Sequence, residues 1–139
     1  MNYPPPGIRR SLAPLLVREG AVELVRRGLP FRMLDEVAAA AGVGRLALAE
    51  VIGISRTTLS RRRDADALKP AESDRLVRVA RLVAMAHELM RGDGAAARRW
   101  LQEPNELIEG ESPLERASTE TGGREVEELI GRLRHGVFS

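Results

Sequence analysis

The chain has 139 residues, of which 43% are hydrophobic, and a formal net charge of +2. This length and composition favour one compact domain, or two very small ones that share a core. Because there is no cysteine and the two histidines, His87 and His135, are far apart in the sequence, we expect no disulfide, no metal site and no cofactor. No run of about 18 apolar residues and no signal-peptide pattern is present, so we expect a cytoplasmic protein with no membrane partner.

The charge is divided unevenly along the chain. Residues 1–100 carry 18 basic and 11 acidic side chains, whereas residues 101–139 carry 4 and 9. A basic surface attracts the phosphate backbone of a nucleic acid, and an acidic segment is repelled by it. The two parts are therefore expected to face different partners.

The elements are predicted to be helical throughout, because Ala, Leu, Arg and Glu dominate and no segment alternates β-branched residues with polar ones. Residues 1–11 are expected to form a flexible arm, since the three prolines at Pro4–Pro6 cannot enter a helix interior. The predicted helices cover residues 11–19, 20–27, 30–41, 45–52, 55–63, 70–91, 93–102, 112–117 and 122–134.

The long helix at 70–91 carries an apolar face that we expect to be the spine of the core. That face consists of Leu76, Val79, Ala80, Val83, Ala86 and Met90. The chain is accordingly divided into the arm at 1–11, a helix-turn-helix part at 12–69, and a small helical part at 70–139 that begins with the long helix.

The segment LAEVIGISRTTLSRRR, residues 48–63, has the spacing of a helix-turn-helix. Ala49 is small where the second helix crosses, Gly53 suits the turn, and Ser55 can cap the second helix. Short hydroxyls and arginines on that helix suit base edges and phosphates. Arg62 departs from the pattern, because many such motifs carry an apolar residue three positions after Leu59. The candidate DNA-binding residues are Ser55, Arg56, Thr57, Thr58, Ser60, Arg61, Arg62 and Arg63.

The alternative interpretation of this segment is a tight helical corner with a solvated polar face. The C-terminal features also have simple interpretations when each is taken singly. A lone tryptophan such as Trp100 is usually buried packing, Ser112–Glu115 is a capping box, and His135 suits the C-terminal end of a helix.

Taken together in their order, these features resemble the Xre/MbcA/ParS class of antitoxins, from about Val22 to the end of the chain. The matching residues are Gly28 and Leu29; Leu48 to Arg63; Leu68 with Glu72 to Leu76; Ala95 and Ala96 with Trp100 and Leu101; Pro104 and Asn105 with Leu107; Gly110 with Ser112 to Leu114; Thr121 with Gly123; and Arg132 with His135 to Val137. Residues 1–11 match nothing in that class, and Gly122 stands where a bulkier residue is frequent.

This resemblance implies an all-α antitoxin with no catalytic activity, whose N-terminal part binds operator DNA and regulates its own operon. It also implies a C-terminal part that silences a RES-domain toxin encoded in the same operon, a toxin that consumes NAD or uses it to transfer ADP-ribose. We expect a homodimer or a higher hetero-oligomer, because one reading helix covers only a few base pairs.

Neutralisation is expected to come from the C-terminal segment, by blocking the toxin's active site. The candidate toxin-binding residues are Trp100, Leu107, Leu114, Arg132, Arg134, His135, Gly136, Val137 and Phe138. For Trp100 the alternative is that its side chain holds the C-terminal part together.

Two other classes of function are weighed against this one. A stand-alone helix-turn-helix repressor that senses a small molecule would need a pocket of converging polar groups, and an enzyme would need a nucleophile or an acid/base set. The sequence shows neither pattern, and the dense carboxylate run Glu125, Glu127 and Glu128 is expected to be a solvated helix face. We therefore predict a protein that is not an enzyme.

Overall fold

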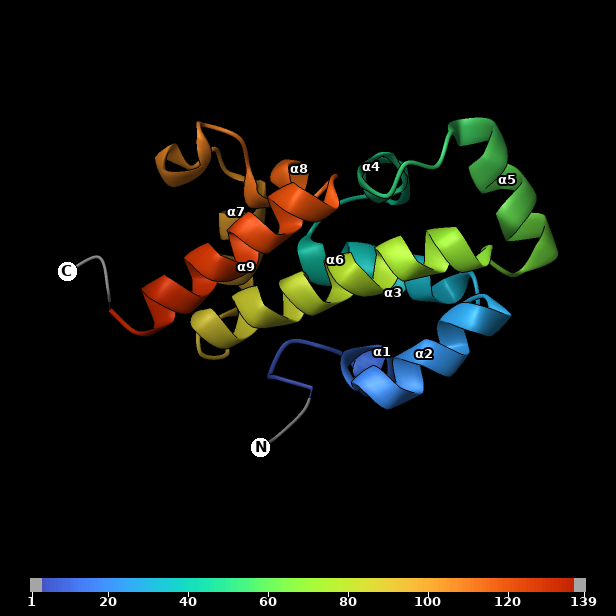
Figure 1. The fold of residues 1–139 in the computed structure, drawn as a ribbon, viewed down its shortest axis with the longest axis horizontal. Helices are drawn as coiled ribbons and strands as arrows, with labels where there is room; N and C mark the ends of the chain where they lie inside the picture. Colours follow the sequence, from blue (N-terminus) through green and yellow to red (C-terminus); the bar gives the residue numbers. More distant parts are fainter. Residues whose placement is uncertain (1–3, 137–139) are drawn as a thin grey trace.

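The computed structural model describes residues 4–136, which form helices packed around one long helix, α6 (Figure 1). In chain order the elements are the 3-10 turn η1 (Arg10–Leu12), the helices α1 (Ala13–Leu16), α2 (Arg18–Arg27), α3 (Arg32–Ala41), α4 (Arg45–Val51), α5 (Arg56–Ala65), α6 (Pro70–Leu89) and α7 (Gly94–Gln102), the 3-10 turn η2 (Glu106–Ile108), and the helices α8 (Pro113–Arg116) and α9 (Glu120–Arg134). Extended pairing in this part of the chain is limited to an isolated bridge between Pro30 and Ala67. The predicted all-α class, with a helix-turn-helix part joined by a long helix to a small helical part, is confirmed.

Helix α6 is buried over more of its circumference than one apolar stripe would give. It packs against α1, α2, α3, α7 and α9, which surround it on several sides. The predicted face is buried from Leu76 to Ala86, whereas Met90 lies just past the end of α6 and is only partly buried. Val77, Leu82 and Ala84 on other faces are buried as well. Because helices from both ends of the chain pack on α6, the two halves share one core. No helix in residues 4–136 is both long enough and apolar enough to cross a membrane.

The first helices divide at a different place from the one predicted. The break lies at Val17, whose backbone is extended, and Gly20 lies inside α2. The carbonyl of Val17 accepts a hydrogen bond from the Ala21 backbone N–H at 2.9 Å, so Val17 serves as the N-cap of α2. A glycine in a helix interior is unfavourable, but the packing of α2 on α6 overrides this local preference.

Residues 4–11, which belong to the expected arm, lie against the body of the protein. Pro5 and Ile8 are buried, and the Ser11 hydroxyl donates a 2.6 Å hydrogen bond to Glu36 on α3. Gly7 approaches the imidazole of His87 so closely that an added Cβ would lie 2.7 Å from Nδ1. The prolines disfavour a helix in this segment, but the side chains of Pro5 and Ile8 are buried against the rest of the protein.

Helix α9 begins at Glu120, two residues before the predicted start. Its N-cap is Thr119, whose hydroxyl accepts a 2.9 Å hydrogen bond from the Gly122 backbone N–H. A Cβ at Gly122 would lie only 1.9 Å from the carbonyl oxygen of Arg116. The glycine therefore permits the close approach between α8 and α9, a contact that helix propensity alone does not reveal.

Candidate nucleic-acid and partner interfaces

Helices α4 and α5 form the turn that the sequence predicts. Gly53 has a φ of +74°, the left-handed conformation that glycine adopts without strain. The Ser55 hydroxyl accepts a hydrogen bond from the Thr58 backbone N–H at 3.2 Å and so caps α5. Leu59 is buried beneath the helix. Helix α5 lies at one end of the molecule (Figure 1), and most of its side chains are exposed.

The candidate DNA-binding side chains are not equivalent in their surroundings. The Thr58 hydroxyl is held locally by Ser55 at 3.0 Å and by Arg61 at 3.3 Å. The exposed candidates, which project from α5 or from the turn before it, are Ser55, Arg56, Thr57, Ser60, Arg61 and Arg63. Only Thr58 and Arg62 in the set are partly buried.

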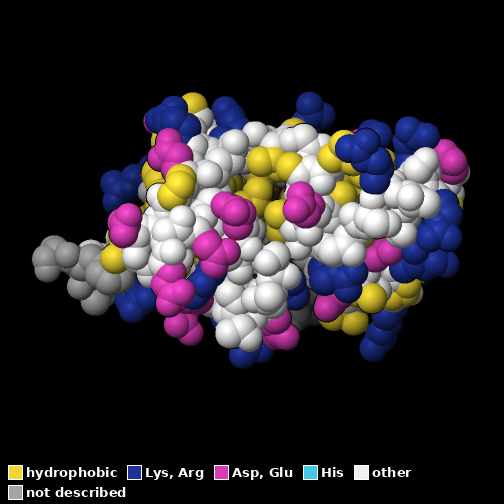
Figure 2. Space-filling view, turned by 90° about the horizontal axis from the view of Figure 1, so that it is seen from above, with side chains coloured by type: hydrophobic (Ala, Val, Ile, Leu, Met, Phe, Trp, Pro, Cys, Tyr) yellow, Lys and Arg dark blue, Asp and Glu magenta, His cyan; other side chains and the backbone are white. Residues whose placement is uncertain are grey.

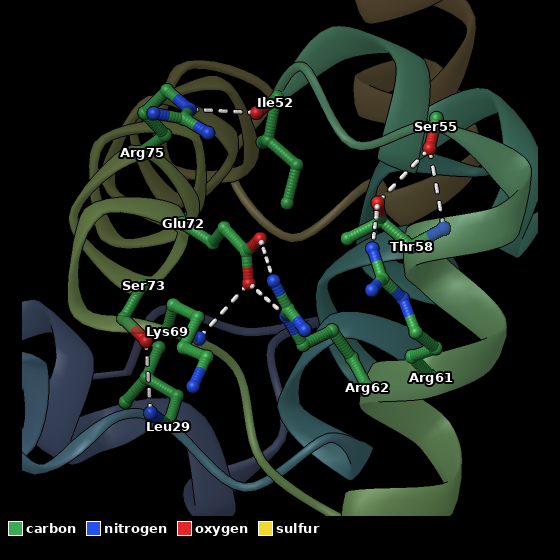
Figure 3. A network of polar contacts seen from close by, with 10 residues as sticks. All are labelled: Leu29, Ile52, Ser55, Thr58, Arg61, Arg62, Lys69, Glu72, Ser73 and Arg75. Atoms are coloured by element: carbon green, nitrogen blue, oxygen red, sulfur yellow. Dashed lines mark hydrogen bonds and ion pairs between the residues drawn. The ribbon is translucent and has the colours of Figure 1, made fainter.

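Arg62 is turned towards α6 and joined to Glu72 (Figure 3). Its Nε and Nη2 atoms donate hydrogen bonds of 2.8 and 3.1 Å to the two oxygens of the Glu72 carboxylate. The exposed fractions of the two side chains are 18% and 10%. A bidentate pair of this kind fixes orientation as well as distance. Arg62 therefore fixes α5 against α6, which accounts for its standing where the motif commonly has an apolar residue.

Two further contacts hold the helix-turn-helix on the first turns of α6 (Figure 3). Arg75 donates a 2.6 Å hydrogen bond from Nε to the carbonyl oxygen of Ile52 at the end of α4. The Ser73 hydroxyl, which is fully buried, accepts a 2.9 Å hydrogen bond from the Leu29 backbone N–H. These α6 side chains thus set the position of the segment before α3, the end of α4 and the face of α5.

A shallow hollow of about 340 Å³ lies between α4 and α5 and carries three arginines. It is lined by Phe31, Arg45, Leu46, Arg56, Leu59, Ser60 and Arg63. Arg45 is absent from the sequence-based set; its Nε and Nη2 donate hydrogen bonds to Asp35 at 2.8 and 2.7 Å, and its guanidinium lies 5.1 Å from the centre of the Phe31 ring. The position of Arg45 as the first residue of the predicted helix 45–52, next to the helix-turn-helix, was the sequence feature that could have added it to the candidate set.

The candidate toxin-binding residues that the structure describes lie on α7, η2, α8 and the end of α9, elements that are separate from α5 (Figure 1). Leu107 on η2 is 54% exposed, whereas Leu114 on α8 is buried at 4%. Trp100 is partly buried and packs against the core, as in its alternative interpretation. Arg132, Arg134, His135 and Gly136 are exposed at the end of α9, and Val137 and Phe138 lie outside the described residues.

The acidic residues of α9 are mostly engaged in ion pairs. Glu125 accepts hydrogen bonds of 2.8 and 3.1 Å from Arg116, and these hydrogen bonds lower the pKa of Glu125. Glu127 pairs with Arg81 of α6 at 3.3 Å. The expectation of a solvated face therefore fits Glu128, which is exposed, while Glu125 and Glu127 help to fix α9 on its neighbours.

The ion pair between Arg62 and Glu72 predicts a specific pH dependence of stability. Burial raises the pKa of Glu72, but the hydrogen bonds from Arg62 and from the Lys69 backbone outweigh it, so the pKa is lowered overall. A group with a lowered pKa in the folded state stabilises the protein above its unfolded pKa, and this stabilisation is lost as the pH falls through the folded pKa.

Glu72→Gln keeps the size of the side chain and an oxygen for the Lys69 N–H, but removes the charge. We expect it to lower the free energy of unfolding by about 2 kcal/mol near neutral pH, because Arg62 loses its partner. The difference from the parent protein should shrink as the pH falls through the lowered pKa of Glu72, because the parent carboxyl then becomes protonated as well. Denaturant unfolding near neutral pH and across this acid range measures the difference, and a loss that stays equal at every pH would contradict the role of the charge.

Two protein-family models match successive parts of the chain. Residues 20–81 match the antitoxin Xre-like helix-turn-helix domain, and residues 85–136 match the antitoxin Xre/MbcA/ParS C-terminal toxin-binding domain. The two regions meet inside α6.

Three similar proteins point to the same family. The chain is 35% identical to an antitoxin Xre of Yersinia enterocolitica over 119 residues, which cover 85% of this chain and 80% of the relative. It is 30% identical to an antitoxin Xre of Photorhabdus laumondii over 117 residues, covering 84% and 79% of the two chains. An antitoxin Xre of Pseudomonas putida is 38% identical over 81 residues, 58% of this chain and 50% of that protein. The predicted resemblance is thereby confirmed, and the chain belongs to the Xre antitoxin family.

Proposed function

We propose that this protein is an antitoxin that binds operator DNA through α5 and neutralises a RES-type, NAD-consuming toxin through its C-terminal helices. The observation that carries the proposal is the placement of the two matched regions at opposite ends of one molecule (Figure 1). Family membership points to a regulatory rather than a catalytic protein, and the ion pairs of Glu125 and Glu127 agree with a structural role for those carboxylates.

The exposed surface of α5 supports the DNA-binding part of the proposal. Arg56, Thr57 and Ser60 present side chains of the types that contact base edges and phosphates. Arg63, which lines the hollow beside them, adds positive charge for the backbone on the flank, whereas the charge of Arg45 is paired with Asp35. One such helix reads only a few base pairs, so a homodimer or a larger assembly would bind two half-sites upstream of its own operon.

The arginine cluster Arg61–Arg63 gives a matched test of this DNA interface. Arg61→Ala and Arg63→Ala should each weaken binding to operator and unrelated duplexes alike, and each should reduce the slope of log affinity against log salt by about one. Arg62→Ala removes the same charge from the same cluster, but should leave the slope unchanged and lower the melting temperature, because Arg62 is paired with Glu72.

Salt-dependent fluorescence anisotropy with the two duplexes, measured well below each variant's melting temperature, reads out these slopes. A slope reduced equally by all three substitutions would show that Arg62 leaves Glu72 to contact phosphate. Slopes unchanged by Arg61→Ala and Arg63→Ala would contradict the assignment of α5 as the DNA-binding surface.

The end of α9 supports the neutralisation part of the proposal. Arg132 and Arg134 are exposed on the last turn and the exposed His135 follows them, so their guanidinium groups and imidazole are placed to donate hydrogen bonds to the phosphates of a nucleotide site. Leu133 packs against the core, and Arg134 contacts Glu88 of α6 at 3.4 Å, so the helix is anchored up to its end. The segment beyond it would cover the toxin's active site and exclude NAD.

Deletion of residues 135–139 tests this tail while it retains Leu133 and the contact between Arg134 and Glu88. The truncated protein should bind operator DNA with unchanged affinity, but should fail to rescue cells from the partner toxin and to inhibit that toxin's NAD consumption in vitro. Operator binding serves as the control for folding. Full rescue by the truncated protein would contradict the blocking tail and would favour a neutralising contact within residues 100–114.

A further inference from the structure

A groove opens on the surface between α4 and α8, at the junction of the two matched regions. Its volume is about 570 Å³, and it lies between the helix-turn-helix and the C-terminal helices. Figure 2 shows it as a hollow with a hydrophobic floor and an acidic side chain on either side. The residues that line it are Val43, Ala47, Glu50 and Val51 from the first region and Gln102, Glu111, Ser112, Leu114, Glu115 and Ser118 from the second.

The charged groups at the groove are all carboxylates. Glu50 is exposed and has no ion-pair partner within residues 4–136. Glu111 accepts a 2.7 Å hydrogen bond from Arg116, and Glu115 accepts a 3.3 Å hydrogen bond from the Ser112 backbone N–H. No lysine or arginine lines the hollow. An acidic rim of this kind repels nucleic acid and attracts cationic groups.

The floor of the groove is apolar, which restricts the occupant further. Val43, Val51 and Leu114 line it together with the small side chain of Ala47. The Gln102 amide at one side already donates to the carbonyls of Ala41 and Arg98, at 3.2 and 3.0 Å. The occupant that suits such a surface is a peptide segment in which aliphatic side chains alternate with lysine or arginine, since apolar groups fill the hollow and cations face the rim.

We propose that this groove receives a cationic segment of the toxin, so that the toxin contacts α4 of the helix-turn-helix as well as the C-terminal helices. The identity of the partner rests on the proposed function. It is favoured because six of the ten lining residues belong to the region that matches the toxin-binding domain. The neutralising interface then extends beyond the end of α9, and Glu50 and Leu114 are part of it.

The first test reverses one rim charge. Glu50→Lys is compared with Glu23→Lys, which makes the same charge change on α2, where Glu23 forms only an exposed pair with Arg27. Affinity is measured by calorimetry against the purified product of the adjacent reading frame. We expect Glu50→Lys to weaken binding by about tenfold or more, with a larger effect at low salt, and Glu23→Lys to stay within about twofold of the parent.

The second test measures directly whether the toxin covers the groove. It is possible because the chain contains no cysteine, so one introduced thiol can be labelled selectively. Ala47→Cys places a single thiol at the groove, and Ala71→Cys places one on the exposed start of α6, away from it. The toxin should slow maleimide labelling of the first thiol by about tenfold or more and leave labelling of the second unchanged.

The outcomes of these tests distinguish a failure of the groove proposal from a failure of the proposed function. If the parent protein does not bind the toxin, the proposed function fails, and the inference falls with it. If the parent binds but the groove thiol remains as reactive as before, the groove inference alone is overturned. Protection of that thiol with unchanged affinity of Glu50→Lys would overturn the claim that the occupant is cationic.

Discussion

The burial of α6 by helices from both ends of the chain is the constraint on which the rest of the structure depends. Its first turns carry Glu72, Ser73 and Arg75, and these side chains fix the helix-turn-helix through Arg62, the Leu29 N–H and the Ile52 carbonyl. The rest of α6 forms the core with α7 and α9. A chain of this size can bury only a limited core, and sharing one helix lets two small functional parts use the same apolar surface.

Charge is distributed unevenly over the surface around α6. Exposed arginines gather on α5, and residues 101–139 carry more acidic than basic side chains, although side chains of both signs occur towards both ends of the molecule (Figure 2). Under the proposed function, the excess of basic side chains on α5 attracts the phosphate backbone, and the excess of acidic side chains in residues 101–139 disfavours it. On this account DNA and toxin bind to different surfaces, and the groove between α4 and α8 lies where those surfaces meet.

Local patterns in the sequence predicted much of this fold. The position of Gly53, the cap at Ser55, the capping box at Ser112 and the apolar face of α6 depend on residues a few positions apart, and all four are present. The order of the C-terminal motifs indicated the family, which no single motif could do.

The features that the sequence did not predict depend on contacts between distant segments. Arg62 stood out as a departure from the motif, but its partner Glu72 comes from another helix. The packing of α8 leaves Leu114 only 4% exposed, and Gly122 has a role only because the carbonyl of Arg116 lies against it. The groove has lining residues from three segments, so no spacing rule could have brought them together.

The central claim is that α6 makes the two parts one cooperative unit, and native-state hydrogen exchange tests it most directly. Helices α3 and α9 come from the two halves of the chain and both pack on α6. We expect their amides to exchange through the same global opening as those of α6 between Leu76 and Ala86, with equal free energies of opening. If α9 instead opened at a clearly lower free energy while α3 and the first half of α6 stayed protected, the two parts would be separate domains, and the account of a shared spine would be contradicted.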